Sequence, residues 1–404
     1  MIDITASRTV GLARLATFTP NMGHNYAHKR NFDYGLEANL AQETWRDNVS
    51  KLSPFIRHRL ITETELITLA IEAHGAQATE KFVTEILWRA YFKGWLEQRP
   101  EVWADYVHTR DVQFKLLKAD GGRRNIYEKA IAGETGIDAF DHWAKQLKSH
   151  GYLHNHARMW FASIWIFTLD LPWQLGADFF LQYLLDGDAA SNSLSWRWVG
   201  GLHTKRKTYL ATQDNIVQFT DGRFKPVGLA TTANPLTENK NYKLRPLKIP
   251  PQPPAASAFA LLVHEEDCRP ESLQLPQKPS LIIGVSGPDG KSPRGVSDQV
   301  RAFANQAVDD AITRAADHFQ CDKIMWKKGE KLQDILKRAK IERLLSPWLP
   351  VGALRDAIGK EMRGNNVRWV MRDYDAALWP LATKGFFAVK KKAPDALRAI
   401  GIKL

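Results

Sequence analysis

Apolar residues recur at spacings of three and four through most of the first half of the chain, which is the repeat of an amphipathic helix. Between about Gln42 and His203 this spacing predicts successive helices, and strand-like alternation is scarce. The clearest of these predicted helices are four. One ends near residue 96, and the others cover 137–150, 153–169 and 177–185. Residues 1–25 lack the pattern and are predicted to be irregular. The first half is therefore expected to be nearly all helical.

A proline-rich segment separates this pattern from a different one. Four prolines stand within residues 250–254, and a helix interior does not accommodate them, so residues 246–256 are predicted to form an extended linker. Beyond the linker, predicted strands alternate with predicted helices, which is typical of a mostly parallel sheet. The strands are expected at 259–264, 281–285, 323–326 and 367–371, and the helices at 298–318, 330–341 and 351–363. The chain is thus divided into a helical domain at 1–245 and a small α/β domain at 257–404.

The charge balance points to a polyanionic partner. Among 404 residues, 56 Lys and Arg outnumber 44 Asp and Glu, which gives a net charge of +12. Each phosphate neutralised by a protein cation releases counterions, so nucleic acid is the natural partner of a basic chain. A basic surface without such a task is the alternative reading.

The cysteine pattern and the apolar runs exclude several protein classes. Cys268 and Cys321 form neither a CxxC pair nor a zinc-ligand spacing, so no disulfide framework and no metal site are expected. The most apolar stretch, residues 159–169, is shorter than the roughly 20 residues that span a bilayer, and Arg8 and Arg14 interrupt the only apolar run near the N-terminus. We expect a cytoplasmic monomer without a membrane segment.

One cation in the predicted helical domain requires an anionic partner. Asn155 and Arg158 lie three residues apart and share a helix face. A buried arginine needs a carboxylate, because its charge is permanent, and both Asp186 and Asp188 are candidates. The alternative reading of Asp-Gly-Asp is a turn or a helix N-cap, since these residue types favour both.

Several motifs between residues 133 and 198 resemble, in their order and spacing, the FAD-binding helical domain of the photolyase/cryptochrome family. They are a G-x-T-G element at 133–136, H-N-x-x-R-M at 154–159, W-x-x-G at 173–176, D-G-D-x-A-S-N at 186–192 and W-x-W at 196–198. Upstream, Y-x-x-x-R at 26–30, S-K-L-S-P at 50–54 and E-x-x-W-R at 85–89 agree with the same family. The resemblance covers residues 26–224. It implies FAD as cofactor.

The resemblance assigns roles to individual residues of this chain. FAD contacts are implied for Tyr26, Arg30, Ser50, Lys51, Leu52, Ser53, Phe82, Glu85, Arg89, Asn155, Arg158, Asp186, Asp188, Ala189 and Asn192. Val49 and Ala90 depart from the family pattern, which has a hydroxyl residue and an acidic residue there. A lesion pocket is implied around Glu85, Trp88, Asn155, Met159 and Trp198, where an extruded base would stack on the indoles. Plain core packing is the alternative for these aromatic residues.

Trp196 and Trp173 match two members of the family's electron-transfer chain, and Trp160, Trp165 and Tyr127 are candidates to replace the third. Basic residues suited to phosphate contacts are Arg110, Arg123, Arg124, Lys205, Arg206 and Lys207.

The resemblance therefore implies a lyase that uses FAD and blue light to repair cyclobutane pyrimidine dimers in DNA, including single-stranded DNA. A photoreceptor or nucleic-acid-binding flavoprotein without repair is the first alternative, and a basic scaffold without flavin is the second. Family members begin with an α/β antenna domain, whereas in this chain predicted strands alternate with predicted helices only after residue 257. Either that domain is relocated to the C-terminal part or an unrelated domain is appended there, and a second chromophore is left open.

Overall fold

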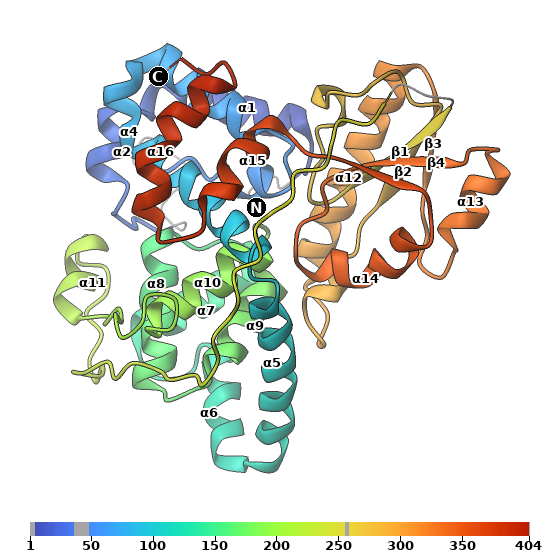
Figure 1. The fold of residues 1–404 in the computed structure, drawn as a ribbon. Coiled ribbons are helices and arrows are strands. Elements are labelled where there is room, and N and C mark those ends of the chain that lie inside the picture. Colours follow the sequence, from blue (N-terminus) through green and yellow to red (C-terminus); the bar gives the residue numbers. More distant parts are fainter. Residues whose placement is uncertain (1–4, 36–47, 255–257, 404) are drawn as a thin grey trace.

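The helical pattern of the first half produces a bundle of packed helices. The computed structural model describes residues 5–35, 48–254 and 258–403; the start of the predicted helical pattern at Gln42 and the last two linker residues lie outside them. The helices of this part are α1 (Arg8–Phe18), α2 (His24–Lys29), α3 (Ser53–Arg57), α4 (Glu63–Glu97), α5 (Glu101–Ala119), α6 (Gly121–Ala132), α7 (Asp138–His150), α8 (Asn155–Ser163), α9 (Trp173–Tyr183), α10 (Ala189–Val199) and α11 (Gln213–Phe219). Figure 1 shows α1 and α2 beside the long α4, α7 to α10 below it, and α5 and α6 projecting as a hairpin.

Helix α1 corrects the prediction that residues 1–25 are irregular. The Ser7 side chain accepts a hydrogen bond from Val10 N and starts the helix. Leu15 and Phe18 are buried against the helical core, while the remaining apolar positions are too few to produce a visible repeat. Tertiary packing therefore stabilises a helix that the sequence pattern did not reveal.

The long helix α4 carries several of the predicted site residues and is anchored at its start. Thr62 accepts a hydrogen bond from Glu65 N, and Glu65 accepts one from Thr62 N, which forms a capping box. The backbone at Gly75 has φ of 78° and interrupts the helix. Residues 82–97 beyond this kink form an uninterrupted helical stretch.

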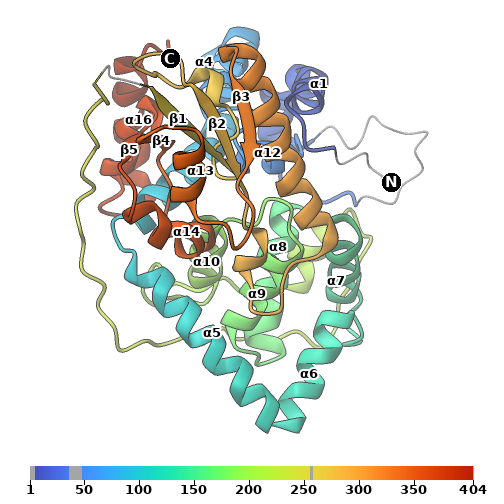
Figure 2. The same cartoon turned by 90° about the vertical axis from the view of Figure 1, so that its right-hand side faces the viewer.

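The second half folds into a five-stranded parallel sheet with helices on both faces. Its strands are β1 (Phe259–His264), β2 (Leu281–Val285), β3 (Asp322–Met325), β4 (Arg343–Pro347) and β5 (Val367–Val370), in the order β3-β2-β1-β4-β5. Its helices are α12 (Asp298–Phe319), α13 (Leu332–Arg338) and α14 (Ala353–Arg363). Leu261 and Val263 face a core shared with α12, whereas Ala260 and Leu262 face α13 and α14 (Figure 2). This confirms the predicted fold class, a helical part followed by a small α/β part.

Strand β4 was missed by the sequence pattern. Only Leu344 and Leu345 form its apolar core, and Pro347 ends it, so it lacks the apolar run of the other buried strands. Its position beside β1 follows from parallel pairing with Phe259 to Leu261.

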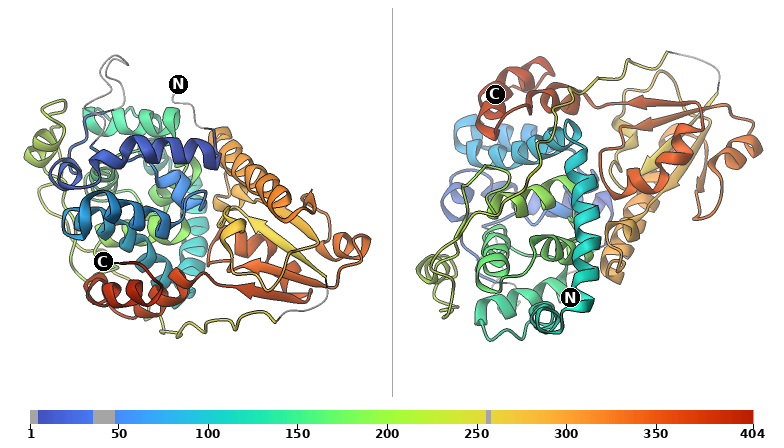
Figure 3. Two further views of the ribbon diagram at one scale, coloured as in Figure 1. Left: turned by 90° about the horizontal axis from the view of Figure 1, so that it is seen from above. Right: turned by 60° about the horizontal axis from the view of Figure 1, so that its bottom comes forward.

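The chain returns to the helical part after the sheet. Helices α15 (Asp373–Leu378) and α16 (Phe386–Ala399) lie on α4, as Figure 3 also shows. At Gly94 a Cβ atom would lie 2.6 Å from the backbone of Trp379, so the close approach requires glycine there. The predicted division at residues 246–256 and the relocated antenna-like domain stay predictions, and the final helices belong spatially with the helical bundle.

The described part of the chain contains no helix that is both long and apolar enough to span a bilayer.

Candidate flavin site

Arg158 and Asp186 form the centre of the candidate site. Arg158, on α8, donates from Nη1 to Asp186 Oδ1 at 3.0 Å and from Nη2 to Oδ2 at 2.8 Å. This fork-to-fork arrangement is the strongest form of an arginine–carboxylate pair. Arg158 Nε also donates to Leu153 O at 3.0 Å, so the guanidinium is fixed in one orientation. Of the two carboxylates that the sequence offered to Arg158, the structure pairs it with Asp186.

Asp188 has a different role, at the start of α10. Its Oδ2 accepts hydrogen bonds from the backbone N and the Oγ of Ser191, both at 2.9 Å, and its Oδ1 pairs with Lys93 Nζ at 2.9 Å. Burial alone would raise the pKa of Asp188, but Lys93 and nearby arginines outweigh burial and hold that pKa well below its usual range. The carboxylate therefore caps α10 in its charged form.

Helix α10 presents Asn192 toward the preceding helix. The Asn192 side chain is 8% exposed, and its Nδ2 donates to Ala177 O on α9 at 2.9 Å. This bond fixes the amide plane. Ala189, also predicted as a contact, opens the same helix.

The predicted residues near the chain start lie together on α2 and α4. Arg30 Nη1 and Glu85 Oε1 are 2.5 Å apart. Burial raises the pKa of Glu85, although Arg30 opposes the shift. Tyr26 packs edge-on against Phe82, with ring centroids 5.2 Å apart. The structure thus brings together four residues that the sequence assigned to one site.

A small, partly open hollow lies beside this group. Lys51, Val49, Gln146, Tyr152 and His154 contribute to its wall. Tyr152 also lies under the Arg158 guanidinium, which is 5.8 Å from its ring centroid. Among the described residues, no hydrogen-bond partner reaches the buried Gln146 Oε1. The unpaired acceptor of Gln146 fits a hydroxyl donor such as that of a ribose, and the lysine in the same wall fits an anionic group such as a phosphate.

The turn before α3 contributes to this wall. Lys51 has φ of 53°, in the left-handed region that residues other than glycine seldom adopt. Ser50 Oγ accepts a hydrogen bond from Leu52 N at 3.3 Å, and Ser53 begins α3. Val49 departs from the family pattern, because it places an apolar side chain where a hydroxyl group was expected.

The residues assigned to the lesion pocket are more dispersed. One face of the Trp88 indole stacks on Phe386 of α16, with centroids 3.6 Å apart and planes at 9°. Trp198 stacks on Tyr209 at 5.7 Å instead. Asn155 is exposed at the start of α8, and Met159 is half-buried. Of the assigned pocket residues, Trp88 therefore has one indole face occupied by Phe386.

The two tryptophans assigned to electron transfer are both buried. Trp196 lies edge-on to Trp165 at 6.2 Å, and Trp165 lies edge-on to Tyr127 at 5.9 Å. A Cβ atom at Gly176 would lie 2.2 Å from the Trp196 ring, which explains why the W-x-x-G element needs glycine. Trp173 packs on Tyr106 at 5.6 Å.

Arg110 was wrongly predicted to be a basic loop residue for phosphate contacts. It is on α5 and 4% exposed, donates to Lys291 O at 3.0 Å and lies 3.5 Å from Asp178. Arg123 and Arg124 are exposed but lie on α6 rather than in a loop, whereas Lys205, Arg206 and Lys207 are exposed in the turn segment after α10.

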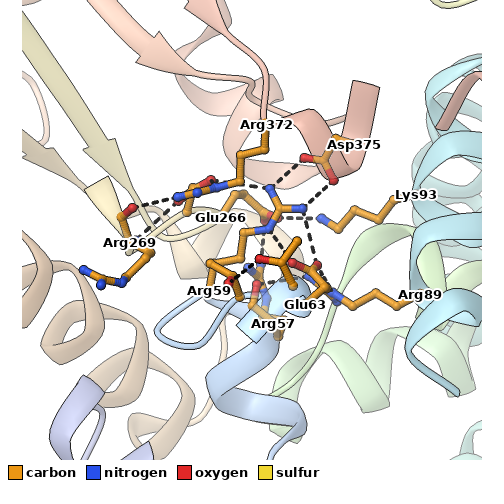
Figure 4. A network of polar contacts seen from close by, with 12 residues as sticks. Arg57, Arg59, Glu63, Arg89, Lys93, Glu266, Arg269, Arg372 and Asp375 are labelled. Carbon is orange, nitrogen blue, oxygen red and sulfur yellow. Dashed lines mark hydrogen bonds and ion pairs between the residues drawn. The ribbon is translucent and has the colours of Figure 1, made fainter. Parts of the chain in front are cut away.

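Sequence reasoning missed a buried ionic network that reaches the site from the sheet. Arg89 does not point to the hollow: it lies 3.4 Å from Glu63. Lys93, one turn further along α4, connects Asp188 to Glu266, and Arg57 connects Glu266 to Gly187 (Figure 4). The only signal in the sequence was the acidic run after β1, because these partners are far apart along the chain.

Acid should weaken this network. The pKa values of Asp188 and Glu266 are lower in the folded chain than in the unfolded chain, so both carboxylates stabilise the fold above about pH 4 and lose that contribution as the pH falls further. The free energy of unfolding, measured with urea, should fall in two stages. The first lies between about pH 7 and pH 5, where the unfolded chain protonates histidines such as His154 and His203, whose pKa values burial lowers to about 4 in the folded chain. The second lies below about pH 4, where Asp188 and Glu266 take up protons. Asp188→Asn should make the second fall shallower; an unchanged acid slope would contradict this assignment.

The comparisons with known proteins concern the same region. Residues 82–228 match the family described as the FAD binding domain of DNA photolyase. A deoxyribodipyrimidine photo-lyase of Streptomyces griseus is 35% identical over 159 residues, which are 39% of this chain and 33% of that protein. One of Thermus thermophilus is 29% identical over 175 residues, or 42% of this chain and 39% of that protein. A solved bacterial class III photolyase from Agrobacterium tumefaciens matches with 24% identity and a TM-score of 0.43, over 53% of this chain and 43% of its own. The chain thus spans well under half the length of these relatives.

Proposed function

Because the chain carries the FAD-binding domain of the photolyase/cryptochrome family at residues 82–228, we propose that it binds FAD and repairs cyclobutane pyrimidine dimers in DNA under blue light. The bidentate Arg158–Asp186 pair, next to the capped turn at Asp188, is the observation that carries the proposal. It lies within the segment that matches the family.

Each part of the candidate site has a task in this proposal. Lys51 and Gln146 would face the phosphate and ribose groups of FAD, while Arg158, Asp186 and Asn192 would orient the polar edge of its ring. Bound FAD would supply the light absorption and the electron that splits the dimer. No metal or nucleophile is assigned a role.

The remaining residues would receive the substrate. Glu85, which Arg30 holds at 2.5 Å, would accept a hydrogen bond from an extruded base. The face of Trp88 opposite Phe386 would stack on that base, a contact worth about 1–3 kcal/mol. Lys205, Arg206 and Lys207, all exposed, would contact backbone phosphates. The proposal requires light-dependent loss of thymine dimers from DNA incubated with the reduced protein.

Trp196→Phe should slow blue-light reduction of the bound flavin by at least about tenfold, because the buried indole next to Trp165 is the proposed electron donor. Absorbance at the flavin band under illumination measures this rate. Chemically reduced Trp196→Phe protein should repair dimers at the parental rate. Equal loss of photoreduction and repair would contradict a pure relay role. Trp143→Phe is the matched control, since that buried indole stacks on Trp160 instead.

A second function is favoured by one observation. The stacking of Phe386 on Trp88 covers half of the surface that a base would use. A photoreceptor or nucleic-acid-binding flavoprotein without repair needs no such surface. It would bind FAD and photoreduce it, yet leave dimers intact.

A further inference from the structure

Glu266, in the acidic turn after β1, bridges two cations that both hold the Gly187–Asp188 turn. Glu266 Oε2 lies 2.8 Å from Lys93 Nζ, and Glu266 Oε1 lies 2.6 Å from Arg57 Nη2. Lys93 Nζ is also 2.9 Å from Asp188 Oδ1, and Arg57 Nε donates to Gly187 O at 3.1 Å. The five residues form a closed ring of charged and polar contacts between the sheet and the helical part, and Figure 4 shows Glu266 between Lys93 and Arg57.

We propose that Glu266 is a positioning residue for the flavin site, because it fixes Lys93 and Arg57 in the places from which they hold the Gly187–Asp188 turn. The inference rests on the proposed FAD site, since that turn connects Asp186 to helix α10. It gives the α/β part of the chain a role in the site without any contact of its own with the cofactor.

The charges in the ring show why Glu266 is required. Lys93 and Arg57 are 6% and 2% exposed, and Asp188 is 2% exposed, so solvent screens their charges weakly. With Glu266, two cations face two carboxylates. Without its charge, Lys93 keeps Asp188, and Arg57 keeps only the longer contact of 3.9 Å to Glu265. Buried Lys291, whose Nζ has no hydrogen-bond partner among the described residues, adds a third positive group nearby. Lys93 and Arg57 would then move apart and release the turn.

Release of the turn would reach the residues that face the cofactor. Asp188 Oδ2 caps α10 through Ser191, and Asn192 is the next residue of that helix. Asp186, whose carboxylate accepts a hydrogen bond from Arg158, directly precedes Gly187 in the sequence. A shift of Gly187 and Asp188 therefore displaces groups on both sides of the turn.

The other half of the ionic network supplies a matched control. Arg59 pairs with Asp375 through two hydrogen bonds of 2.6 and 2.7 Å, and Asp375 is 1% exposed. This pair also joins the helical part to the second half of the chain, but none of its described contacts is with Gly187, Asp188 or Lys93. Asp375→Asn therefore weakens the same interface without touching the turn.

The test measures amide hydrogen exchange of residues 185–192 and the affinity for added FAD, with the full chain in four forms: parental, Glu266→Gln, Glu266→Asp and Asp375→Asn. We expect Glu266→Gln to speed exchange in the turn and to weaken FAD binding, each by about tenfold. Glu266→Asp keeps the charge and should change the exchange rate and the FAD affinity by about threefold each. This variant gives a result even if the Gln variant does not fold. Asp375→Asn should lower the thermal midpoint yet change neither quantity by more than about twofold.

Equal exchange rates of the turn in the Glu266 and Asp375 variants would overturn the proposal, because Glu266 would then only hold the interface together. Exchange is measured in flavin-free protein, so a chain that fails to repair dimers still gives a readable answer on Glu266. Faster exchange with unchanged FAD affinity would also overturn it, since the turn would move without consequence for the site.

Discussion

Arg59→Ala should lower the free energy of unfolding by about 3–5 kcal/mol, the usual cost of removing one partner of a buried ion pair. The substitution leaves Asp375, Glu63 and Asp267 buried, with exposures of 1%, 3% and 2%. Arg59 pairs with all three, at 2.6, 3.1 and 3.4 Å. Asp267 keeps Arg372 and Glu63 keeps Arg89, but Asp375 loses its cationic partner and would have to take up a proton or draw in water.

Urea unfolding followed by tryptophan fluorescence measures this loss. Arg398→Ala is the control, because Arg398 pairs with Asp395 on the surface of α16 and both side chains are more than half exposed. It should change the free energy of unfolding by no more than about 0.5 kcal/mol. A loss below about 1 kcal/mol for Arg59→Ala would contradict the view that the network holds the two parts together.

Arg158→Ala should weaken FAD binding by about a hundredfold. Asp186 loses the two charge-assisted hydrogen bonds that fix it, and the ring edge of FAD loses the charge-assisted hydrogen bond that Arg158 would donate. A bond of this kind is worth about 1.5–3 kcal/mol, or up to two orders of magnitude in affinity. The freed carboxylate would also repel the electron-rich edge of the ring. Fluorescence titration of flavin-free protein with FAD measures the dissociation constant.

Arg158→Lys separates charge from geometry in the same titration. Lysine keeps the positive charge but cannot form the two parallel bonds, so we expect an intermediate loss of about tenfold. Unchanged FAD affinity in Arg158→Ala, with the thermal midpoint preserved, would place the cofactor elsewhere.

Local sequence signals predicted much of the fold, because many elements have a clear apolar pattern with turn residues at both ends. Strands β1 and β2 have the predicted bounds, since each is an apolar run with turn residues at its ends. Helix α12 extends one residue beyond its prediction. Helix α16 was missed, because Lys390 to Lys392 and Pro394 disguise its buried positions Val389, Ala393 and Leu397.

The candidate site could be predicted only where its residues lie close along the chain. The motif at 154–159 and the acidic turn at 186–188 share one region, and the sequence left the partner of Arg158 open between two carboxylates. Arg57 and Glu266 are separated by 209 positions, so no local pattern shows that they meet. The contact between Trp88 and Phe386 depends on the return of the chain to α4, which the sequence pattern did not predict.

Light-dependent loss of thymine dimers from a synthetic oligonucleotide tests the proposed function most directly. Purified, chemically reduced full-length protein is incubated with single-stranded and double-stranded substrate, in blue light and in the dark. The proposed function predicts loss of dimers in light alone, and the two substrates show which form of DNA is used. No loss in light, from protein that contains FAD and photoreduces it, would contradict repair and favour the photoreceptor function.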